Sequence, residues 1–495
     1  MRFRHASIIL ILILTGTTLF ARTDPRRSAL IRIDNIKREA LLKHTFLSYD
    51  EYDYRSIISV VRDTAFVLVT PAELSLLRER GVACQIVLED SSELVLIRRA
   101  MYGPSLHLEK PYHSYQEILR EIESLQQQFP TLMQRIQIGT TAGKQQPIYA
   151  VKVSKDVRKF DGRPAVLIDG CHHSNEVLGA EICTAALHEL VEQYGKDPDI
   201  TRWVDMFQIY IIPVVNVDGH DIVSSGQDPR WRKNARDTDG NGMLNFPDGI
   251  DINRNYDFNW AHGGSDEPNS GRYRGPMPFS EPEPRALATF AQQKRLILSI
   301  TYHSQGEVIF YPWNWGGRKA PDDALLTEVA RGLAGSIPTM RGDTSYKAEY
   351  GAGTVGQSYP WLYGRLGTMD FIVETGNGAS IFPPHEVAGI VKANLKGIHY
   401  MLRRAEGPGL AVQVTDAKTG TPLEATVWFP AIETEDVDRR TSNPQTGMHH
   451  RILKPGAYTF HVSKPGYTPV VLNKVTVSDS GWTSIKVSLR TATGR

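Results

Sequence analysis

Apolar and polar residues alternate in two different ways along this chain, and the change falls at the GPGL segment, residues 407–410. Before that point, short apolar runs typical of buried strands alternate with amphipathic stretches typical of helices. This alternation predicts an α/β domain over residues 110–405, with a mixed, mostly parallel sheet and helices on both faces. The clearest strands are expected at 146–154, 165–170, 207–216, 296–304 and 370–375, and the clearest helices at 112–130 and 177–195.

Two further segments flank this domain. Residues 408–495 alternate apolar and polar side chains with period two between Thr-Gly, Pro-Gly and Ser-Gly turns, which predicts a C-terminal antiparallel β-sandwich. Residues 23–100 read as strand, helix and strand, which predicts a small N-terminal α/β module. This module has the size of an inhibitory prodomain or an accessory domain, and Arg98-Arg99 offers a processing point behind it.

The first residues predict export. Residues 1–21 carry Arg2 and Arg4, then an apolar run from Ala6 to Leu14, then small and polar residues, which is the pattern of a secretory signal peptide. The run is short for a membrane span, although an uncut anchor is the alternative. No other stretch is apolar enough to cross a membrane, so the mature protein is expected to be secreted or periplasmic.

The charge and the cysteine content of the chain limit which functions and which stabilising bonds are expected. Of the 495 residues 22% are charged and the net charge is +1, which gives no general case for nucleic acid binding. Three cysteines in an exported chain do not form a disulfide framework. The hydrophobic core, with or without a bound metal, must therefore hold the fold together.

Residues 171–176 (CHHSNE) join a predicted buried strand to a predicted helix. In open α/β sheets ligands collect at the carboxyl ends of strands. One of the two histidines, His172 or His173, and Glu176, with one more nitrogen ligand from elsewhere, would form a His₂Glu zinc site with an open position for water. The competing interpretation is a polar turn with a capping role. In a zinc site that His172 does not join, this residue would either support the site or be exposed to solvent.

Further polar residues stand at strand ends or in loops, and each has an ordinary structural interpretation as well. An Arg with a neighbouring amide suits bidentate capture of a carboxylate, although surface salt bridging is the alternative. A carboxylate at the end of a buried strand must be paired or functional. These residues are Asn216 and Asp218, Arg232 in WRK, Asn253-Arg254, His303 and Glu374.

The order of these motifs closely resembles the zinc carboxypeptidase family, the carboxypeptidase A-like metallopeptidases. The segment HSNEVLGAE is most similar to the branch of carboxypeptidases N, E and D, which also carries a transthyretin-like β-sandwich behind the catalytic domain. The resemblance covers about residues 110–495. It implies a zinc metallocarboxypeptidase that hydrolyses the C-terminal peptide bond of peptides or proteins.

The resemblance also implies residue roles. His173, Glu176 and His303 would hold Zn²⁺, and Glu374 would be the general base that works with zinc-bound water. Arg232 would polarise the scissile carbonyl. Asn253 and Arg254 would bind the C-terminal carboxylate of the substrate.

A mobile tyrosine usually covers the substrate in this family, and Tyr350 is the candidate. Matching Trp361 to the family's tryptophan leaves Tyr350 two residues out of register, so Tyr359 and Tyr363 are rivals. Tyr359 falls where the digestive enzymes set their side-chain preference, and it is neither acidic nor small and aliphatic. The sequence therefore does not indicate which terminal residue is preferred.

Residues 237–248 (DTDGNGMLNFPD) match a different pattern, that of an EF-hand calcium loop. Asp237, Asp239 and Asn241 occupy positions 1, 3 and 5, Gly242 occupies position 6, and Asp248 replaces the usual Glu at position 12. The pattern predicts Ca²⁺ as a second metal that orders the segment between Arg232 and Arg254. The alternative is a polar, turn-rich loop without metal.

Three other functions stay open beside the carboxypeptidase. One is a related zinc amidase acting on cell-wall peptides, since Asn253-Arg254 favours a substrate with a free carboxylate but does not indicate the chirality of its terminal residue. Another is a catalytically silent peptide-binding protein on the same scaffold, against which the presence of Glu374 argues. The third is an adhesion protein acting through the β-sandwich, which is expected instead to pack against the catalytic domain and stabilise it.

Overall fold

The computed structural model describes residues 29–34, 57–61, 64–69, 71–88, 110–244, 248–351, 355–377 and 379–492. The chain divides into two compact units. The first comprises residues 1–105, 237–249 and 267–273, and the second comprises 106–236, 250–266 and 274–495. The predicted signal peptide, residues 1–21, lies outside the described residues.

The described part of the N-terminal segment is a small α/β module, as the sequence predicts. Its strands form an antiparallel sheet in the order β2-β3-β1-β4, and the helix connects β3 to β4. Apolar side chains from β1, β3 and the helix form its core. The elements are β1 (Ala29–Ile33), β2 (Ile57–Val61), β3 (Thr64–Val69), α3 (Pro71–Glu79) and β4 (Gln85–Leu88).

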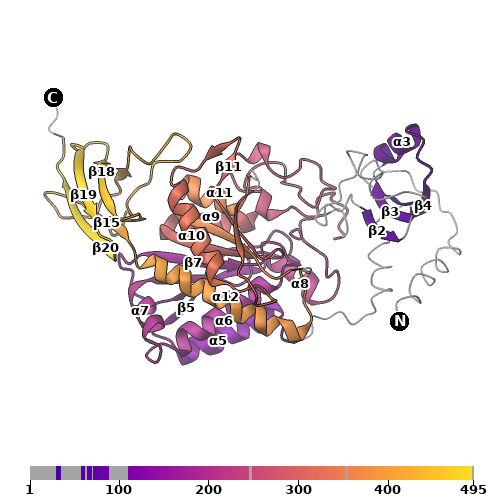
Figure 1. The fold of residues 1–495 in the computed structure, drawn as a ribbon, viewed down its shortest axis with the longest axis horizontal. Coiled ribbons are helices and arrows are strands. Elements are labelled where there is room, and N and C mark those ends of the chain that lie inside the picture. The colour runs from indigo at the N-terminus through magenta and orange to yellow at the C-terminus, as the bar shows by residue number, and fades with distance from the viewer. Residues whose placement is uncertain are drawn as a thin grey trace. The chain divides into compact units, whose positions relative to one another are not determined.

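A mixed sheet forms the centre of the second unit, with the strand order β13-β10-β14-β9-β7-β8-β6-β5 among the described residues (Figure 1). Strands β8, β7, β9 and β14 are neighbours and run parallel to one another. The expected strands are thus confirmed. The bounds are β5 (Met133–Thr140), β6 (Pro147–Val153), β7 (Ala165–Gly170), β8 (Gln208–Ile212), β9 (Leu296–His303), β10 (Val308–Tyr311), β13 (Lys347–Tyr350) and β14 (Met369–Glu374); β11 (Asn314–Trp315) and β12 (Arg318–Lys319) pair separately.

Helices cover both faces of this sheet. Side chains alternate between the two faces of a strand, so Gly170 and Tyr302 share one face while Tyr210 belongs to the other. Gly170 meets α6, and the ring of Tyr210 packs edge-on against Phe290 of α9 at 5.0 Å. The helices are α5 (Tyr115–Gln128), α6 (Leu178–Glu192), α7 (Pro198–Met206), α8 (Val217–Ser224), η2 (Ile252–Arg254), η3 (Trp260–His262), α9 (Pro282–Lys294), α10 (Asp323–Ser336), α11 (Ser358–Trp361), η4 (Leu362–Leu366) and α12 (Pro384–Ala405).

The end of β7 and the start of α6 approach so closely that two glycines are required. A Cβ on Gly170 would lie 2.7 Å from the carbonyl carbon of Gly179, and one on Gly179 would lie 3.1 Å from the Cα of Gly170. Cys171, directly after β7, has a φ of 54°, and this left-handed residue turns the chain toward α6. The segment 171–176 is therefore fixed against the sheet at both of its ends.

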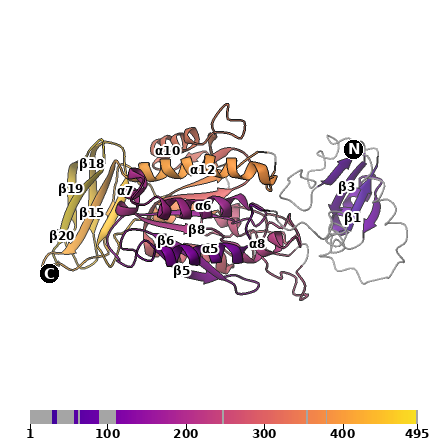
Figure 2. The ribbon, with the colours of Figure 1, turned by 90° about the horizontal axis from the view of Figure 1, so that it is seen from below.

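The C-terminal segment forms the predicted β-sandwich, which belongs to the same compact unit as the α/β domain (Figure 2). Within the described residues 409–492 its sheets are ordered β17-β15-β20 and β16-β18-β19. The sequence analysis expected antiparallel pairing throughout, but β15 and β20 run parallel. Period-two alternation shows which face is buried and not the strand direction, and these strands are far apart in the chain. The bounds are β15 (Gly409–Asp416), β16 (Thr426–Trp428), β17 (Met448–Ile452), β18 (Gly456–Ser463), β19 (Val470–Val477) and β20 (Trp482–Leu489).

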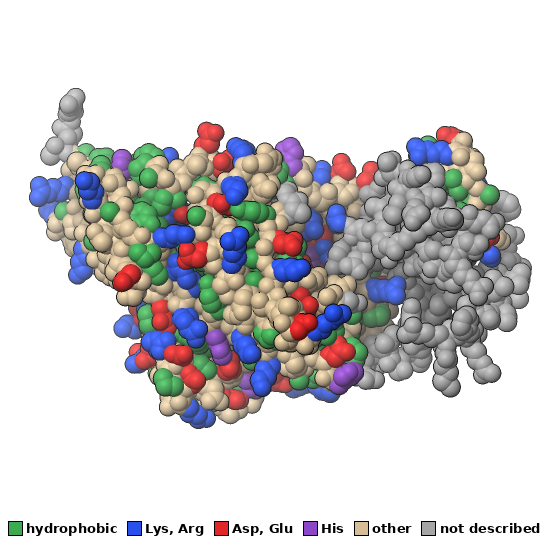
Figure 3. All heavy atoms as spheres, viewed as in Figure 1, with side chains coloured by type: hydrophobic (Ala, Val, Ile, Leu, Met, Phe, Trp, Pro, Cys, Tyr) green, Lys and Arg blue, Asp and Glu red, His purple; other side chains and the backbone are tan. Residues whose placement is uncertain are grey.

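The surface is mixed in charge. On the face that Figure 3 shows, Lys and Arg side chains are interspersed with Asp and Glu over the second unit, in keeping with the net charge of +1. Among the residues that the structure describes, none of the helices combines the length and the apolar character that a bilayer crossing needs.

Candidate active site

The predicted metal ligands come from the carboxyl ends of neighbouring parallel strands. The turn that holds His173 and Glu176 follows β7, and His303 is the last residue of the adjacent β9. Glu374 ends the next strand, β14, and is the Cα partner of His303 in the parallel register. Because parallel strands end at one edge of the sheet, side chains far apart in sequence meet there.

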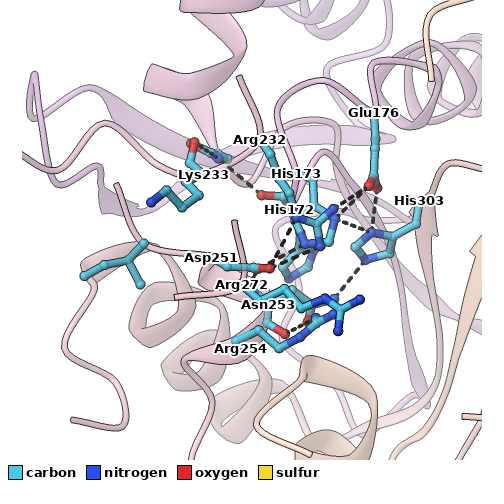
Figure 4. A network of polar contacts seen from close by, with 12 residues as sticks. His172, His173, Glu176, Arg232, Lys233, Asp251, Asn253, Arg254, Arg272 and His303 are labelled. Carbon is cyan, nitrogen blue, oxygen red and sulfur yellow. Dashed lines mark hydrogen bonds and ion pairs between the residues drawn. The ribbon is translucent and has the colours of Figure 1, made fainter. Parts of the chain in front are cut away.

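His173, Glu176 and His303 converge on one point, and all three are buried (Figure 4). Nδ1 of His173 lies 2.9 Å from Oε1 of Glu176 and 3.0 Å from Nδ1 of His303. Nδ1 of His303 lies 2.7 Å from Oε2 of Glu176. Two imidazole nitrogens and one carboxylate are a donor set that zinc takes in catalytic sites, so these residues fit Zn²⁺.

Asp251 is a buried partner of this group that the sequence analysis did not identify. Its Oδ1 lies 3.1 Å from Nε2 of His173, and its Oδ2 accepts hydrogen bonds from Nη2 and Nε of Arg232 at 3.1 and 3.3 Å. A carboxylate on the outer nitrogen of a ligating histidine fixes the orientation of the ring. The sequence feature that could have indicated this role is the position of Asp251, two residues before the Asn253-Arg254 pair.

Arg232 is buried and lies directly beside the predicted metal ligands. Nη1 of Arg232 is 3.1 Å from Oε1 of Glu176, and Figure 4 shows its side chain between Glu176 and Asp251. Ser174 anchors the loop that carries Arg232, because its backbone nitrogen donates to the carbonyl of Arg232 at 3.1 Å and its hydroxyl donates to that of Trp231 at 2.7 Å. The turn that carries two predicted metal ligands therefore also positions Arg232.

Asn234 fixes the other side of the same loop. Its Oδ1 accepts from the backbone nitrogen of Ile250 at 2.8 Å, and its Nδ2 donates to Oε2 of Glu281 at 2.8 Å. Its own backbone nitrogen donates to the carbonyl of Ile250 at 3.0 Å. Because Ile250 precedes Asp251, these bonds set the distance between Arg232 and its carboxylate partner.

Asn253 and Arg254 lie on the short helical turn η2, beside the metal group. The side-chain nitrogen Nδ2 of Asn253 is 3.1 Å from Nε2 of His303. The side-chain oxygen Oδ1 of Asn253 accepts a hydrogen bond from the backbone nitrogen of Ser358 at 3.0 Å. Arg254 is half-buried, and its Nη1 donates to the carbonyl of Asn253 at 2.8 Å. Its Nε is buried and has no hydrogen-bond partner among the described residues. Burial lowers the pKa of this guanidinium, since the charged form loses solvation.

Electrostatics favour the protonation states that metal ligands need. Burial acts to raise the pKa of Glu176, but the charges of His173 and His303 outweigh it and the net pKa lies below the ordinary value. Burial opposes ionisation of Asp251 too, yet Arg232 and His173 hold its pKa well below the usual range. Burial lowers the pKa of His303 to about 3. Two carboxylates and a neutral imidazole are therefore the expected forms at neutral pH.

His172 is buried and does not join the metal group. Its Nε2 lies 3.0 Å from the hydroxyl of Tyr256, and its Nδ1 lies 3.2 Å from Oδ1 of Asp169. The hydroxyl of Thr301 donates to Oδ2 of Asp169 at 3.2 Å and lies 3.3 Å from Asp370. Burial, and next the charge of Asp169, raises the pKa of Asp370 to about 7. A buried polar network thus lies behind the predicted ligands.

The predicted substrate-covering tyrosine is placed differently from the other site residues. The hydroxyl of Tyr350 donates to Oδ1 of Asp323 at 2.7 Å and accepts from Nζ of Lys319 at 2.8 Å. Its rival Tyr363 donates to Oδ2 of Asp322 at 2.8 Å. Tyr359 is buried, and burial raises the pKa of its hydroxyl against the opposing charge of Arg254. The structure thus places neither Tyr350 nor Tyr363 in contact with the predicted metal group.

The predicted calcium loop belongs to the first compact unit. Carboxylate oxygens of Asp237, Asp239 and Asp248 come within 4.8 Å of one another. Asn241 is engaged locally, since its Nδ2 donates to Asp239 at 2.9 Å and its Oδ1 accepts from the backbone nitrogen of Met243 at 2.7 Å. Three of the four predicted ligands are therefore grouped.

Comparisons with known proteins identify the family of this chain. The family model "Zinc carboxypeptidase" matches residues 118–396. The chain is 28% identical to mast cell carboxypeptidase A of Rattus norvegicus over 307 residues, which cover 60% of this chain and 72% of that protein. It is 28% identical to carboxypeptidase B of Homo sapiens over 305 residues, with 60% and 71% covered.

A solved structure supports the fold. The crystal structure of thrombin activatable fibrinolysis inhibitor matches with a TM-score of 0.56 and 23% identity, over 76% of this chain and 98% of that one. The matched family region contains the predicted metal ligands His173, Glu176 and His303 together with Arg232, Asn253, Arg254 and Glu374. The chain therefore belongs to the zinc carboxypeptidase family and is a zinc-dependent metallocarboxypeptidase.

Proposed function

We propose that this protein is an exported carboxypeptidase that removes single residues from the C-termini of peptides or proteins. The observation that carries the proposal is Arg254, a half-buried guanidinium beside the predicted zinc ligands, whose buried Nε has no hydrogen-bond partner in the part of the chain that the structure describes. A buried donor without a partner is costly, and a planar carboxylate is the group that a guanidinium binds in bidentate fashion. A substrate's terminal carboxylate supplies that partner and fixes cleavage one residue from the end.

The chain's own residues divide the chemistry among them. When bound by His173, Glu176 and His303, zinc supplies Lewis acidity toward the peptide carbonyl and toward water. Arg232 stabilises the negative charge that develops on the carbonyl oxygen, as its guanidinium already lies 3.1 Å from Glu176 at the centre of the site.

Glu374 acts as the general base in this proposal. Its place beside His303 at the ends of two paired strands supports the assignment. It takes a proton from the attacking water and delivers that proton to the leaving amine. Asn253 orients the terminal carboxylate together with Arg254, and it is held for this by Ser358.

Release of terminal amino acids from a mixed peptide library tests the proposal. We expect single residues to leave one at a time, chelation to stop their release, zinc to restore it, and Glu374→Gln to be inactive. Glu349→Gln, at an exposed position on β13, is the matched control and should keep full activity. If the library stays intact while cell-wall peptides are cleaved, the protein is the related amidase instead.

Export is proposed on the signal peptide pattern of residues 1–21. The protein expressed with these residues should appear outside the cytoplasm, and its N-terminal sequence should begin shortly after Ala21. Recovery in the cytoplasm with residue 1 intact would contradict it.

Calcium is proposed as the second metal, bound by Asp237, Asp239, Asn241 and Asp248. The EF-hand spacing and the grouping of three carboxylates support it. Titration calorimetry of the zinc-loaded protein with Ca²⁺ should show one binding event that Asp237→Asn weakens. An identical heat trace for both proteins would refute this assignment, and zinc-dependent activity would be unaffected by that outcome.

A further inference from the structure

A buried cluster of charges joins the β-sandwich to the catalytic domain. Arg451 of β17 forms an ion pair with Glu433, and its Nη2 donates to Oδ2 of Asp322 at 3.0 Å. Nη2 of Arg440 lies 3.5 Å from the same carboxylate oxygen. Asp322 directly precedes α10 in the catalytic domain, whereas the other three residues belong to the sandwich. All four side chains are at most 4% exposed, so two arginines of the sandwich are buried where it contacts the catalytic domain.

This cluster holds the helical turn η4. Tyr363 and Asp322 bind each other twice: the hydroxyl donates to Oδ2 at 2.8 Å, and the backbone nitrogen of Asp322 donates to the hydroxyl at 3.0 Å. The guanidinium of Arg440 lies 5.4 Å from the centre of the Tyr363 ring. The backbone nitrogen of Asp438 donates to the carbonyl of Gly364 at 2.8 Å. Sandwich residues thus contact both the backbone of η4, at Gly364, and one of its side chains, that of Tyr363.

Close packing leaves this turn little room to move. A Cβ on Gly367 would lie 2.2 Å from Nε of Arg440, so the arginine side chain lies directly against the backbone where η4 ends. A Cβ on Gly364 would lie 2.2 Å from the ring of Phe258. The turn is therefore enclosed by the sandwich and by the segment that follows η2.

The other end of the same segment reaches the substrate site. Helix α11 runs directly into η4, and its first residue, Ser358, donates its backbone N–H to Oδ1 of Asn253 at 3.0 Å. The amide nitrogen of Asn253 is 3.1 Å from Nε2 of His303. The ring of Trp361 packs against Tyr256 with the centres 6.0 Å apart, and Tyr256 contacts His172. Residues 358–366 are thus a continuous rigid link between the two ends.

We propose that the β-sandwich helps to position the substrate-binding residue Asn253, with Arg451 as the positioning residue. Arg451 holds Asp322, Asp322 holds Tyr363, and the turn that carries Tyr363 presents Ser358 to Asn253. The inference rests on the proposed role of Asn253 in binding the substrate carboxylate. Its physical basis is the cost of leaving Asp322 buried without its main cation, which favours a shift of Asp322 toward solvent and so breaks its hydrogen bonds to Tyr363 and loosens the turn.

The test compares Arg451→Met with Arg295→Gln in the full-length, zinc-loaded protein. Arg295 also joins the two domains, but its ion pair with Glu424, at 2.7 Å, is on the surface. Hydrogen exchange of peptides covering Ser358, and the KM and kcat for C-terminal release, are measured well below the melting temperature. We expect Arg451→Met to speed exchange at Ser358 about tenfold and to raise KM about tenfold with a smaller change in kcat. Arg295→Gln should match the wild type.

Tyr363→Phe is the second variant, in case Arg451→Met does not fold. It removes one hydroxyl while keeping the ring, and it should change exchange at Ser358 and KM in the same direction. A lower melting temperature with unchanged exchange at Ser358 and unchanged KM in these variants would overturn the inference, since it would leave the arginine a merely structural role. Failure of the wild type to cleave any peptide would refute the proposed function alone, because hydrogen exchange still reads the link from Arg451 to Ser358.

Discussion

Replacing Asp251 by Asn should weaken zinc binding and stability together. Asn keeps the shape of the side chain but removes the charge and one acceptor oxygen. Asp251 is fully buried, accepts two hydrogen bonds from Arg232 and lies 3.1 Å from the outer nitrogen of His173. It also accepts from the backbone nitrogen of Asn253 at 3.0 Å. One substitution therefore reaches a metal ligand, the proposed oxyanion residue and the proposed carboxylate clamp.

The magnitude follows from these contacts. Loss of an outer partner of a ligating histidine typically costs about 10- to 100-fold in metal affinity. Removing one member of a buried ion pair costs roughly 3–5 kcal/mol, and the cost here should lie near the lower end of that range because Arg232 keeps its ion pair with Glu176. Zinc competition against a coloured chelator measures the first quantity, and urea unfolding of the metal-free protein measures the second. Both should change in Asp251→Asn.

The matched control is Asp257→Asn, because Asp257 is 52% exposed and its nearest cation, on Arg365, is 3.9 Å away. It should match the wild type in both assays. Zinc affinity for Asp251→Asn within about twofold of the control would refute the reasoning, since an outer partner that holds His173 must affect the metal. Lower affinity with unchanged stability would mean that Arg232 finds another acceptor in the variant.

Four further predictions concern other parts of the chain. A carboxyl group whose pKa is raised in the folded state binds more protons when the protein is folded, so ionisation of Asp370 should lower the free energy of unfolding as pH rises from about 4 to about 7. Urea unfolding at about pH 5 and about pH 8 should therefore show a smaller loss of stability in Asp370→Asn than in the wild type. Gly179→Ala should destabilise the fold by about 1–3 kcal/mol in the same assay, since its Cβ would lie 3.1 Å from Gly170. Arg254→Lys should raise KM far more than it changes kcat, because a single ammonium cannot bind a carboxylate in bidentate fashion. Cleavage after Arg99 should increase kcat/KM if residues 23–100 form an inhibitory prodomain; equal activity before and after cleavage would refute that role.

The sequence predicted the sheet and its ligand-bearing edge for a physical reason. Parallel strands buried on both faces appear as continuous apolar runs, so β7, β9 and β14 are visible without any alignment. Polar residues at the ends of such runs stand out, and His173, His303 and Glu374 all end or follow one. Their mutual proximity follows from the rule that parallel strands deliver their carboxyl ends to one edge.

Residues in the loops were harder to predict. Asp251 lies in a loop, where a single Asp has many ordinary functions such as turn formation, and its contacts depend on how the loop folds back. Tyr350 depended on matching positions across a loop, and no periodicity fixes the register there. The direction of β20 against β15 was also undetermined, because burial patterns are identical for parallel and antiparallel neighbours.

The contrast between His172 and His173 shows why adjacent residues can have different functions. The turn after β7 directs His173 toward Glu176 and His303, while His172 meets Asp169 and Tyr256. Asp169, Thr301 and Asp370 are Cα partners or near neighbours in the paired strands β7, β9 and β14, so alternation places them on one common face. The rings of His172 and His303 stack with centres 5.6 Å apart, so the buried polar network packs directly against a predicted zinc ligand. The precision of the metal site therefore depends on this network as well as on Asp251, and a substitution at Asp370 should affect the orientation of His303 without touching any ligand.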